Sequence, residues 1–485
     1  MLILNVVAKQ KQEDIIEMGS LIERIYSNKY MVKPEEIVGE IPTDKEIYKN
    51  AIEMSWPSAL EAVLVQLIAS ADLIMVGGLG AAAISAVGIT TQPKFILLAI
   101  IFSLNVGVTA VVARRKGEGN REEANNALRQ SIVISFFVSL ILSILGIMFA
   151  RPLIIFAGAQ SDVVDAAVIY FKIICVGNFF TSLSLTINAA QRGVGNTKIS
   201  MKTNVAANLV NLVFNYLLIG GNFGFPALGV TGAAIATAIG NFIGFLLSLK
   251  SVMNSHGFLE IKKSQSWKPD KSTLASILNI SGSAFVEQVF MRIGFFTTNK
   301  LVASLGTVEF ATHQICMNII SLSFAFGDGL GIAASALVGQ NLGAKRPDIA
   351  TIYGRSIQRI AVTVGLLFTI AFLLGGRFIL SLYTNELAVL EAGAKIMIII
   401  ACFAPINTSN VVISGSLRGS GDTKFVAYTS FVSIGIVRPG ATWLFCYPLG
   451  LGLIGAWFAF GTDQLLRFIT NYTRFLKGEW TKIKI

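Results

Sequence analysis

The sequence predicts an all-α integral membrane protein, and the observations behind this prediction are its composition, its apolar runs and an internal repeat. Of the 485 residues, 53% are hydrophobic and only 14% are charged. A soluble fold needs about a quarter of its residues charged to cover its surface. The four cysteines lie in apolar runs without a CxxC pair, which excludes a disulfide-rich secreted fold.

Apolar runs long enough to cross a membrane recur along the whole chain. A bilayer core of about 30 Å takes roughly 20 apolar residues in a helix. The runs are centred near positions 65, 100, 138, 178, 211, 240, 290, 325, 365, 403, 435 and 463. The sequence therefore predicts twelve transmembrane helices.

Basic residues gather after every second span. Arg114, Arg115 and Lys116 follow the second span, and Lys262 and Lys263 follow the sixth. Because cytoplasmic loops are enriched in lysine and arginine, both termini are predicted to be cytoplasmic. The formal net charge of +11 then reflects membrane topology and requires no nucleic-acid partner.

An internal repeat relates the two halves of the chain at an offset of 226 residues. This offset carries Glu61 onto Glu287 and Gly117 onto Gly343. It also carries the sequence RGVGNTK, which begins at Arg192, onto RGSGDTK. Two halves of six helices each enter the membrane from the same side, so the repeat is parallel. Repeats of this kind place the substrate site between the halves.

The repeat and the charge pattern together divide the chain into five parts. We predict a cytoplasmic tail over 1–48, a six-helix N-terminal lobe over 49–255 and a cytoplasmic linker over 256–274. A second six-helix lobe over 275–476 and a cytoplasmic tail over 477–485 complete the chain. A helical period in the first tail predicts a short interfacial helix, and a disordered tail is equally compatible. The residues with this period are Ile15, Met18, Ile22, Ile25 and Tyr26.

The order of short motifs along both lobes resembles that of the multidrug and toxic compound extrusion (MATE) family of secondary transporters. The resemblance covers residues 47–480 and rests on the first-helix segment 57–80 and on ARRKG at 113–117. It continues with GFPALG at 224–229 and LVGQNLGA at 337–344. The family implies two lobes around a V-shaped cleft and export of amphipathic, mostly cationic small molecules by alternating access.

Several properties of the predicted transporter follow from what accompanies these helices. The sequence contains no nucleotide-binding motif, so transport would be driven by a gradient of H⁺ or Na⁺. We expect no cofactor and no catalytic residues. The predicted protein is a monomer that spans the plasma membrane and contacts the lipid bilayer, its substrates and its coupling ion.

Asp72 is the most informative single residue. It lies within the first apolar run, where inserting a carboxylate into the membrane costs about 2.5–3.5 kcal/mol. The alternative is a position at the membrane boundary, near the outer end of the helix. Its position matches the ion-coupling aspartate of the family, and the resemblance gives it the partners Tyr170, Asn188 and Asn211. A second aspartate of one family subset is Asn215 here. One carboxylate among amides suits either a proton or a dehydrated Na⁺.

The repeat gives the C-terminal lobe no carboxylate equivalent to Asp72. The offset carries Asp72 onto Thr298, and the two amides are lost as well. The corresponding pairs are Asn188 with Ser414 and Asn211 with Val437. Ion coupling is therefore predicted to reside in the N-terminal lobe alone.

Another branch of the family binds its cation in the C-terminal lobe through two carboxylates. The resemblance places those positions at Met291 and Asn407, neither of which is ionisable. Glu287 lies one helical turn before Met291 and is an alternative ligand on the same face. With this sodium site missing, the sequence predicts proton coupling at Asp72 in preference to sodium coupling.

Further charges within the spans are candidates for lining or gating the cleft. The repeat relates Glu61 and Glu287, which favours equivalent places beside the cleft. Charges at this depth are normally paired. Arg292 is therefore expected to pair with one of the acids Glu287, Asp328 and Glu61.

One lysine and two prolines are expected near the ion site. Lys94 in the second span is expected to lie beside Asp72, where it would favour the charged carboxylate. Pro57 and Pro93 lack a backbone N–H and predict kinks in the first two spans.

Two other functions are less compatible with the sequence than export. A lipid-linked oligosaccharide flippase shares this architecture but is expected to line its cavity with arginine and lysine, whereas the embedded charges here are mixed. A membrane-embedded enzyme is disfavoured because the only histidines are His256 and His313, and no HExxH or GxSxG motif occurs.

Overall fold

A computed structural model describes residues 26–159, 161, 163–253, 257–262 and 265–483. The helical period predicted within the first 25 residues lies outside this part of the chain.

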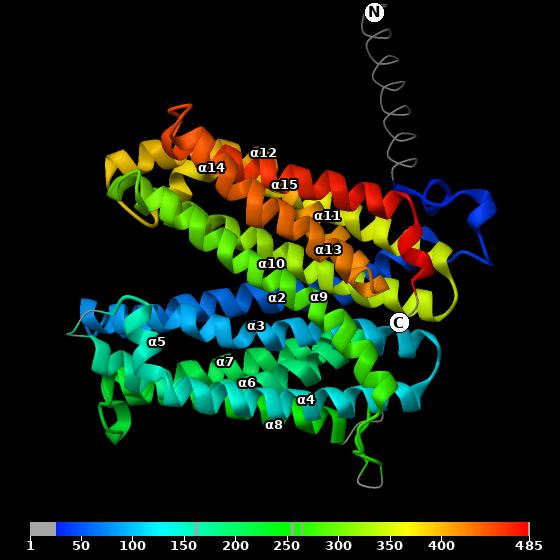
Figure 1. Cartoon of the computed structure of the whole chain (residues 1–485), viewed down its shortest axis with the longest axis horizontal. Coiled ribbons are helices and arrows are strands. Elements are labelled where there is room, and N and C mark those ends of the chain that lie inside the picture. Colours follow the sequence, from blue (N-terminus) through cyan, green and yellow to red (C-terminus); the bar gives the residue numbers. More distant parts are fainter. Residues whose placement is uncertain (1–25, 160, 162, 254–256, 263–264, 484–485) are drawn as a thin grey trace, which may run out of the picture.

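Six long helices form the N-terminal lobe (Figure 1). They are α2 (Asp44–Gly77), α3 (Ala81–Gly117), α4 (Arg121–Met148), α6 (Val164–Gly193), α7 (Thr197–Gly220) and α8 (Gly229–Met253). The short helix α5 (Ala150–Phe156) connects α4 to α6. Pro57 lies inside α2 and Pro93 inside α3, and each helix continues through its proline.

The C-terminal lobe repeats this arrangement. Its helices are α9 (Lys271–Ala303), α10 (Thr307–Gly343), α11 (Pro347–Ser381), α12 (Leu387–Ser420), α13 (Thr423–Ser430), α14 (Arg438–Cys446) and α15 (Gly452–Leu476). A π-helical segment, η4 (Phe431–Val437), joins α13 to α14. These two helices with η4 correspond to one span, α7, of the other lobe.

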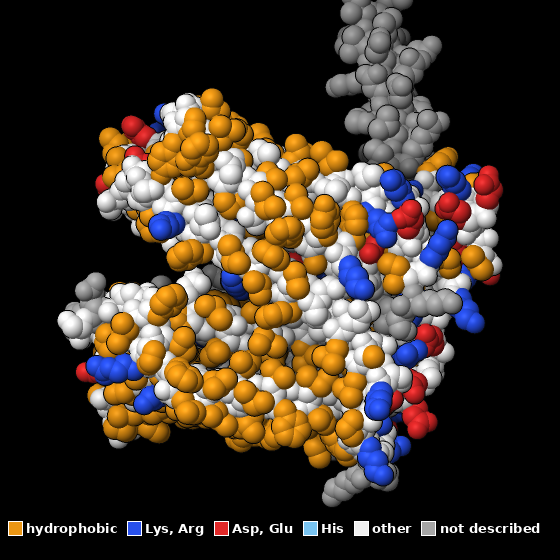
Figure 2. Space-filling view, in the orientation of Figure 1, with side chains coloured by type: hydrophobic (Ala, Val, Ile, Leu, Met, Phe, Trp, Pro, Cys, Tyr) orange, Lys and Arg blue, Asp and Glu red, His pale blue; other side chains and the backbone are white. Residues whose placement is uncertain are grey.

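The helices have the length and composition of membrane spans. Within the described ranges, nine helices are long and apolar enough to cross a bilayer. Helix α2, the segment from α13 to α14, and α15 fill the remaining three places of the repeat. Figure 2 shows hydrophobic side chains over the flanks of both lobes and charged side chains gathered at one end. The predicted all-α membrane fold of twelve spans in two lobes is confirmed.

The two lobes meet at the end of the molecule near the described chain ends. Helix α2 packs against α10, and α3 packs against α9 and α10. Gly117 and Gly343 allow the closest approach, because a Cβ on either one would lie within 3.0 Å of backbone atoms of the other lobe. The backbone oxygens concerned belong to Gln340 and Arg114. Toward the other end the lobes diverge, and the space-filling view shows a notch between them (Figures 1 and 2).

Both chain ends cross from their own lobe to the other. Met31, in the segment before α2, is fully buried against α10 and α11. The backbone N–H of Val38 donates to Asp348 at 3.1 Å. At the other end of the chain, Arg114 Nη2 donates to the backbone oxygen of Ile483 at 2.7 Å. These contacts bridge the lobes at the end opposite the notch.

Candidate functional site

Asp72 lies in the last two turns of α2, in the half of the N-terminal lobe that faces the notch end. Asp72 is half-buried and its carboxylate faces α7. Asn215 Nδ2 of α7 donates to Asp72 Oδ1 at 2.7 Å. The side-chain oxygen of Asn215 is buried and has no hydrogen-bond partner. The amide is thus held by the carboxylate alone.

Asn211, one turn earlier on α7, contacts the same carboxylate. The hydrogen-bond network orients its amide nitrogen toward Asp72, with distances of 3.2 and 2.8 Å to Oδ1 and Oδ2. Its oxygen then accepts from the hydroxyl and the backbone N–H of Thr237, both at 3.1 Å. The Asp72 carboxylate therefore accepts hydrogen bonds from two amides on one helix.

Tyr170 and Lys94 surround this carboxylate without bonding to it. Tyr170 of α6 packs against an apolar cluster that contains Val76 and Ile219. The Lys94 ammonium attracts the Asp72 carboxylate electrostatically. In the described part of the chain, however, no ion pair within 4.0 Å joins these two groups. Lys94 thus adds positive potential and leaves room between the charges.

Asn188 belongs to a separate polar cluster around Glu61. Its amide nitrogen donates to Asn204 at 3.4 Å, and its oxygen accepts from Thr203 and Ser248, both at 3.2 Å. Asn204 in turn donates to Glu61. The structure therefore brings Asn211 and Asn215 to Asp72 and places Asn188 in the cluster around Glu61.

Glu61 is held by a set of donors at the buried centre of its lobe. Ser200 donates to its carboxylate at 3.2 Å, in addition to Asn204. Arg192 Nη1 lies 3.6 Å from Glu61 Oε1. The side chains of Arg192 and Glu61 are only 14% and 10% exposed, so this ion pair is shielded from solvent.

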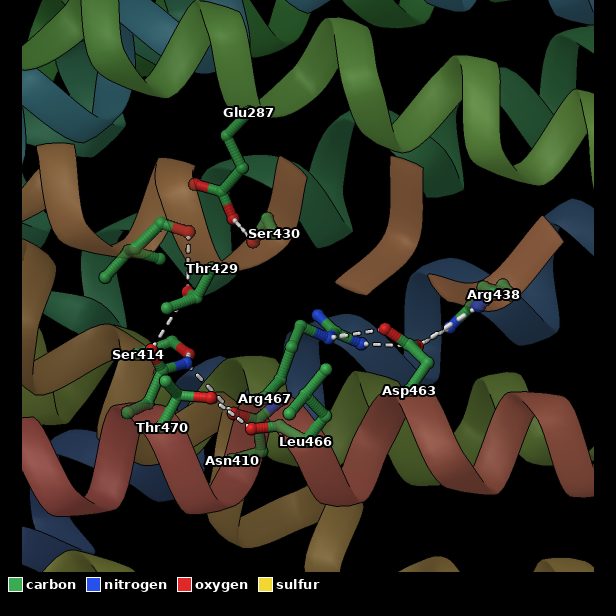
Figure 3. Close-up of polar contacts among 12 residues, drawn as sticks. Glu287, Asn410, Ser414, Thr429, Ser430, Arg438, Asp463, Leu466, Arg467 and Thr470 are labelled. Carbon is green, nitrogen blue, oxygen red and sulfur yellow. Dashed lines mark hydrogen bonds and ion pairs between the residues drawn. The ribbon is translucent and has the colours of Figure 1, made fainter. Parts of the chain in front are cut away.

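The second lobe carries an equivalent ion pair. Arg418 Nη2 lies 2.5 Å from Glu287 Oε1. Ser430 donates to the same carboxylate oxygen at 3.1 Å, as Figure 3 shows. The offset of 226 relates Glu61 to Glu287, Arg192 to Arg418 and Asn204 to Ser430. One polar cluster is therefore built twice.

The predicted pairing of Arg292 is wrong. Among the described residues, no carboxylate lies within 4.0 Å of its guanidinium, because Glu287 pairs with Arg418 and Glu61 with Arg192. The Nε atom of Arg292 is buried without a hydrogen-bond partner. Asp328 of α10 is exposed and attracted by Arg418, and no ion pair within 4.0 Å holds it in the described chain.

A third ionic cluster lies inside the C-terminal lobe. Asp463 of α15 contacts Arg438, whose Nε lies 3.1 Å from Oδ2, and Arg467, whose Nε lies 3.3 Å from Oδ1 (Figure 3). The Asp463 side chain is fully buried and that of Arg438 is 2% exposed. Phe295 and Phe460 each lie with their ring centres 4.8 Å from Arg438 Cζ. Two guanidiniums around one carboxylate leave a net positive charge.

The remaining C-terminal positions show no ligand set. The hydroxyl of Thr298, at the place equivalent to Asp72, is buried without a partner. Both amide atoms of Asn407 are also buried and unbonded. Met291 is half-buried on α9. No group of three or more His, Cys, Asp or Glu side chains able to hold a metal occurs in the described ranges.

The sequence does not predict the roles of several residues in these clusters. In the sequence Arg192 and Arg418 stand out only as the first residues of the repeated motif, although the offset of 226 relates both the arginines and the glutamates with which they pair. Asp463 lies within an apolar run, as Asp72 does, and this position alone indicates a paired or functional charge. No sequence feature indicates a role for the hydroxyl of Thr237 in the sixth span.

The two halves of the chain match one family model in succession. The MatE model matches residues 57–217 and again 283–444, with starting points separated by the repeat offset. An "Uncharacterized transporter YisQ" of Bacillus subtilis is 26% identical over 441 residues, which cover 90% of this chain and 96% of that protein. A "Probable multidrug resistance protein NorM" of Thermotoga maritima is 28% identical over 447 residues, with 91% and 94% covered.

The fold is also similar to that of solved transporters. One structure, described as the "Outward-facing conformation of a multidrug resistance MATE family transporter of the MOP superfamily", has a TM-score of 0.83 at 20% identity. The similarity covers 89% of this chain and 97% of that one.

Proposed function

Because the chain belongs to the MATE family of membrane transporters, we propose that it is a secondary antiporter that exports lipophilic organic compounds, drugs among them, in exchange for protons. Relatives named as multidrug resistance proteins support the type of cargo. The cleft between the lobes is the transport path, and Asp72 is the group that takes up and releases the proton.

The observation that carries this proposal is the orientation of the amides around Asp72. A charged carboxylate only accepts hydrogen bonds, and both amide nitrogens face it. Protonation converts one carboxyl oxygen into a donor. An O–H that points at one of these amide nitrogens places a donor against a donor, which favours a rearrangement when Asp72 binds a proton.

Asn211 has a second orientation that suits the protonated acid. If the Asn211 amide reverses, its oxygen faces Asp72 and can accept the carboxyl proton, and its nitrogen can donate to the Thr237 hydroxyl while it gives up the hydrogen bond from the Thr237 backbone N–H. The Thr237 hydroxyl accepts in one orientation and donates in the other. This exchange links the charge of α2 to the contacts of α7 and α8, which is the link that alternating access requires.

The same geometry disfavours sodium. Hard cations prefer oxygen ligands. At Asp72 the neighbouring amides present nitrogen, and Lys94 adds positive potential. In the C-terminal lobe, Asp463 is already surrounded by two guanidiniums. Among the described residues, and with the amide nitrogens turned toward Asp72, neither lobe therefore presents the shell of oxygen ligands that a hard cation prefers.

The charge distribution supports the orientation in the membrane that the sequence predicts. Lysine and arginine gather at the end where the lobes meet, and this end is cytoplasmic by the positive-inside rule. The notch then opens to the outside of the cell. In this arrangement Asp72 is accessible to outside protons, which bind while the substrate leaves.

The test is the replacement Asp72→Asn, which removes the titratable group and keeps the shape. The purified variant in liposomes is expected to lose gradient-driven efflux of a fluorescent substrate at least tenfold and to bind that substrate as the wild type does. Asp165→Asn is the matched control, because Asp165 is exposed at the outer end of α6 in a surface pair with Arg151. Wild-type efflux by Asp72→Asn would refute the proposed role.

A further inference from the structure

Arg292 and Phe95 face each other across the boundary between the lobes. Arg292 projects from α9 and its Cζ lies 5.3 Å from the ring centre of Phe95 on α3. A guanidinium over an aromatic face is an attractive contact. The space-filling view shows basic atoms at the inner end of the notch (Figure 2). Because this contact joins α9 to α3, the pair lies where the two lobes meet.

The charge of Arg292 is not balanced by the protein. Its guanidinium has no carboxylate within 4.0 Å in the described chain, and its Nε is buried without a partner. Glu287, which precedes Arg292 on α9, and its repeat equivalent Glu61 form ion pairs with other arginines. Arginine within a membrane is costly unless it pairs, and its retention points to a function.

Lys94 adds a second basic group at comparable depth. At a rise of 1.5 Å per residue, Arg292 lies about 16 Å from the notch end of α9 and Lys94 about 20 Å from that of α3. Lys94 is half-buried, and Phe95 follows it directly on α3. One turn from Arg292 toward the notch, Phe296 is 73% exposed and offers an apolar surface.

We propose that Arg292 binds an anionic group, a carboxylate above all, of an amphipathic substrate in the cleft, with Lys94 as a second attracting charge. A guanidinium presents two parallel N–H groups whose spacing matches a carboxylate. Phe95 holds the guanidinium plane from the opposite lobe, and the apolar body of the substrate lies against side chains such as Phe296. The preferred cargo is a lipophilic organic acid or zwitterion.

This assignment rests on the proposed function and narrows its substrate class. The family resemblance implies mostly cationic compounds. A ligand that carries only positive charge is repelled by Arg292 and Lys94, and a zwitterion places its carboxylate there and its amine toward the exposed Asp328 or Asp72. The anionic group therefore distinguishes good from poor substrates.

The test uses two dyes that differ in one group. One is a rhodamine with a free benzoate, a zwitterion, and the other is the methyl ester of the same rhodamine, a cation. Binding to the purified full-length protein is measured by fluorescence polarisation. The wild type is expected to bind the acid about tenfold or more tightly than the ester, as one charge-assisted hydrogen-bonded contact allows.

Variants assign the preference to Arg292. Arg292→Gln is expected to weaken binding of the acid about tenfold and to leave that of the ester unchanged or improved. Arg292→Lys is expected to keep part of the preference. Arg151→Gln, at an exposed pair on α5, is the matched control and is expected to bind as the wild type does. Equal affinities of the wild type for both dyes, or equal losses for both dyes in Arg292→Gln, would overturn the proposal.

The outcome is separable from that of the ion-coupling test. The dye comparison with the wild type needs no gradient and no variant, so it remains decisive if Arg292→Gln fails to fold. A preference for the acid combined with wild-type efflux by Asp72→Asn would refute the coupling role and support this one. Loss of efflux in Asp72→Asn, with equal wild-type affinities for the two dyes, would support the coupling role of Asp72 and refute the anion site at Arg292.

Discussion

Gly117 and Gly343 provide a mechanical test of the two-lobe arrangement. The repeat offset relates them, and each lies against the backbone of the other lobe where α3 and α10 cross. In Gly117→Ala the new Cβ would lie within 3.0 Å of the backbone oxygen of Gln340. Backbone cannot rotate aside as a side chain does, so the lobes must separate at this end.

The magnitude follows from the cost of overpacking. Inserting one methyl group into a well-packed contact costs about 1–3 kcal/mol. The present arrangement is open at the notch, and alternating access requires a second arrangement that is open at the end where the lobes now meet. If the second arrangement lacks this contact, the full cost of the methyl group shifts the equilibrium between the two arrangements. A change of about 1–3 kcal/mol corresponds to a shift of roughly 5–150-fold.

The assay measures the distance between the lobes at the end where they meet. Labels at the exposed positions Glu122 on α4 and Lys424 on α13 report that distance by double electron–electron resonance, once the exposed Cys402 has been replaced. The expected result for Gly117→Ala is a longer distance in most molecules. Gly88→Ala is the matched control, because α3 also contains Gly88 and a Cβ there has nothing within 4 Å.

An unchanged distance between the two labels in Gly117→Ala would contradict the predicted separation of the lobes. If Gly117→Ala, Gly88→Ala and the wild type give the same distribution of distances and the same unfolding temperature, the close approach does not limit the position of the lobes. A lower unfolding temperature with an unchanged distance would also count against the proposed movement.

Two further predictions concern the difference between the lobes. Thr298→Ala, at the position equivalent to Asp72, should leave proton-driven efflux within about twofold of the wild type, because the Thr298 hydroxyl has no partner; a loss as large as that of Asp72→Asn would refute this. Arg418→Gln should destabilise the protein by about 3–5 kcal/mol, since it leaves Glu287 buried without its ion partner. Arg192→Gln should cost less, because Ser200 and Asn204 still donate to Glu61, and thermal unfolding in detergent compares the two variants.

Much of the fold could be predicted from the sequence because the membrane restricts the alternatives. Apolar runs of spanning length admit only helices, and the position of lysine and arginine orders them. The offset that carries Gly117 onto Gly343 predicted two equivalent halves, and the double match to one family model agrees with it. Family membership also confirms that the chain is a transporter and not an enzyme.

The partners of the charged side chains were harder to predict. Whether an acid meets Arg292 depends on how α9 is rotated about its axis, and an apolar helix with polar residues on several faces does not reveal this rotation. The acid that shares α9 with it, Glu287, faces Arg418, which is 131 residues away in the chain. Asn188 likewise faces α8 and Asn204, where the resemblance had placed it beside Asp72.

The central claim is that protons, and not sodium ions, drive export through Asp72. It is tested most directly by dye efflux from liposomes at a fixed proton gradient, with sodium replaced by choline. The account predicts that efflux continues at the same rate in choline and stops when the proton gradient is collapsed. Efflux that stops without sodium and recovers with a sodium gradient alone would contradict it.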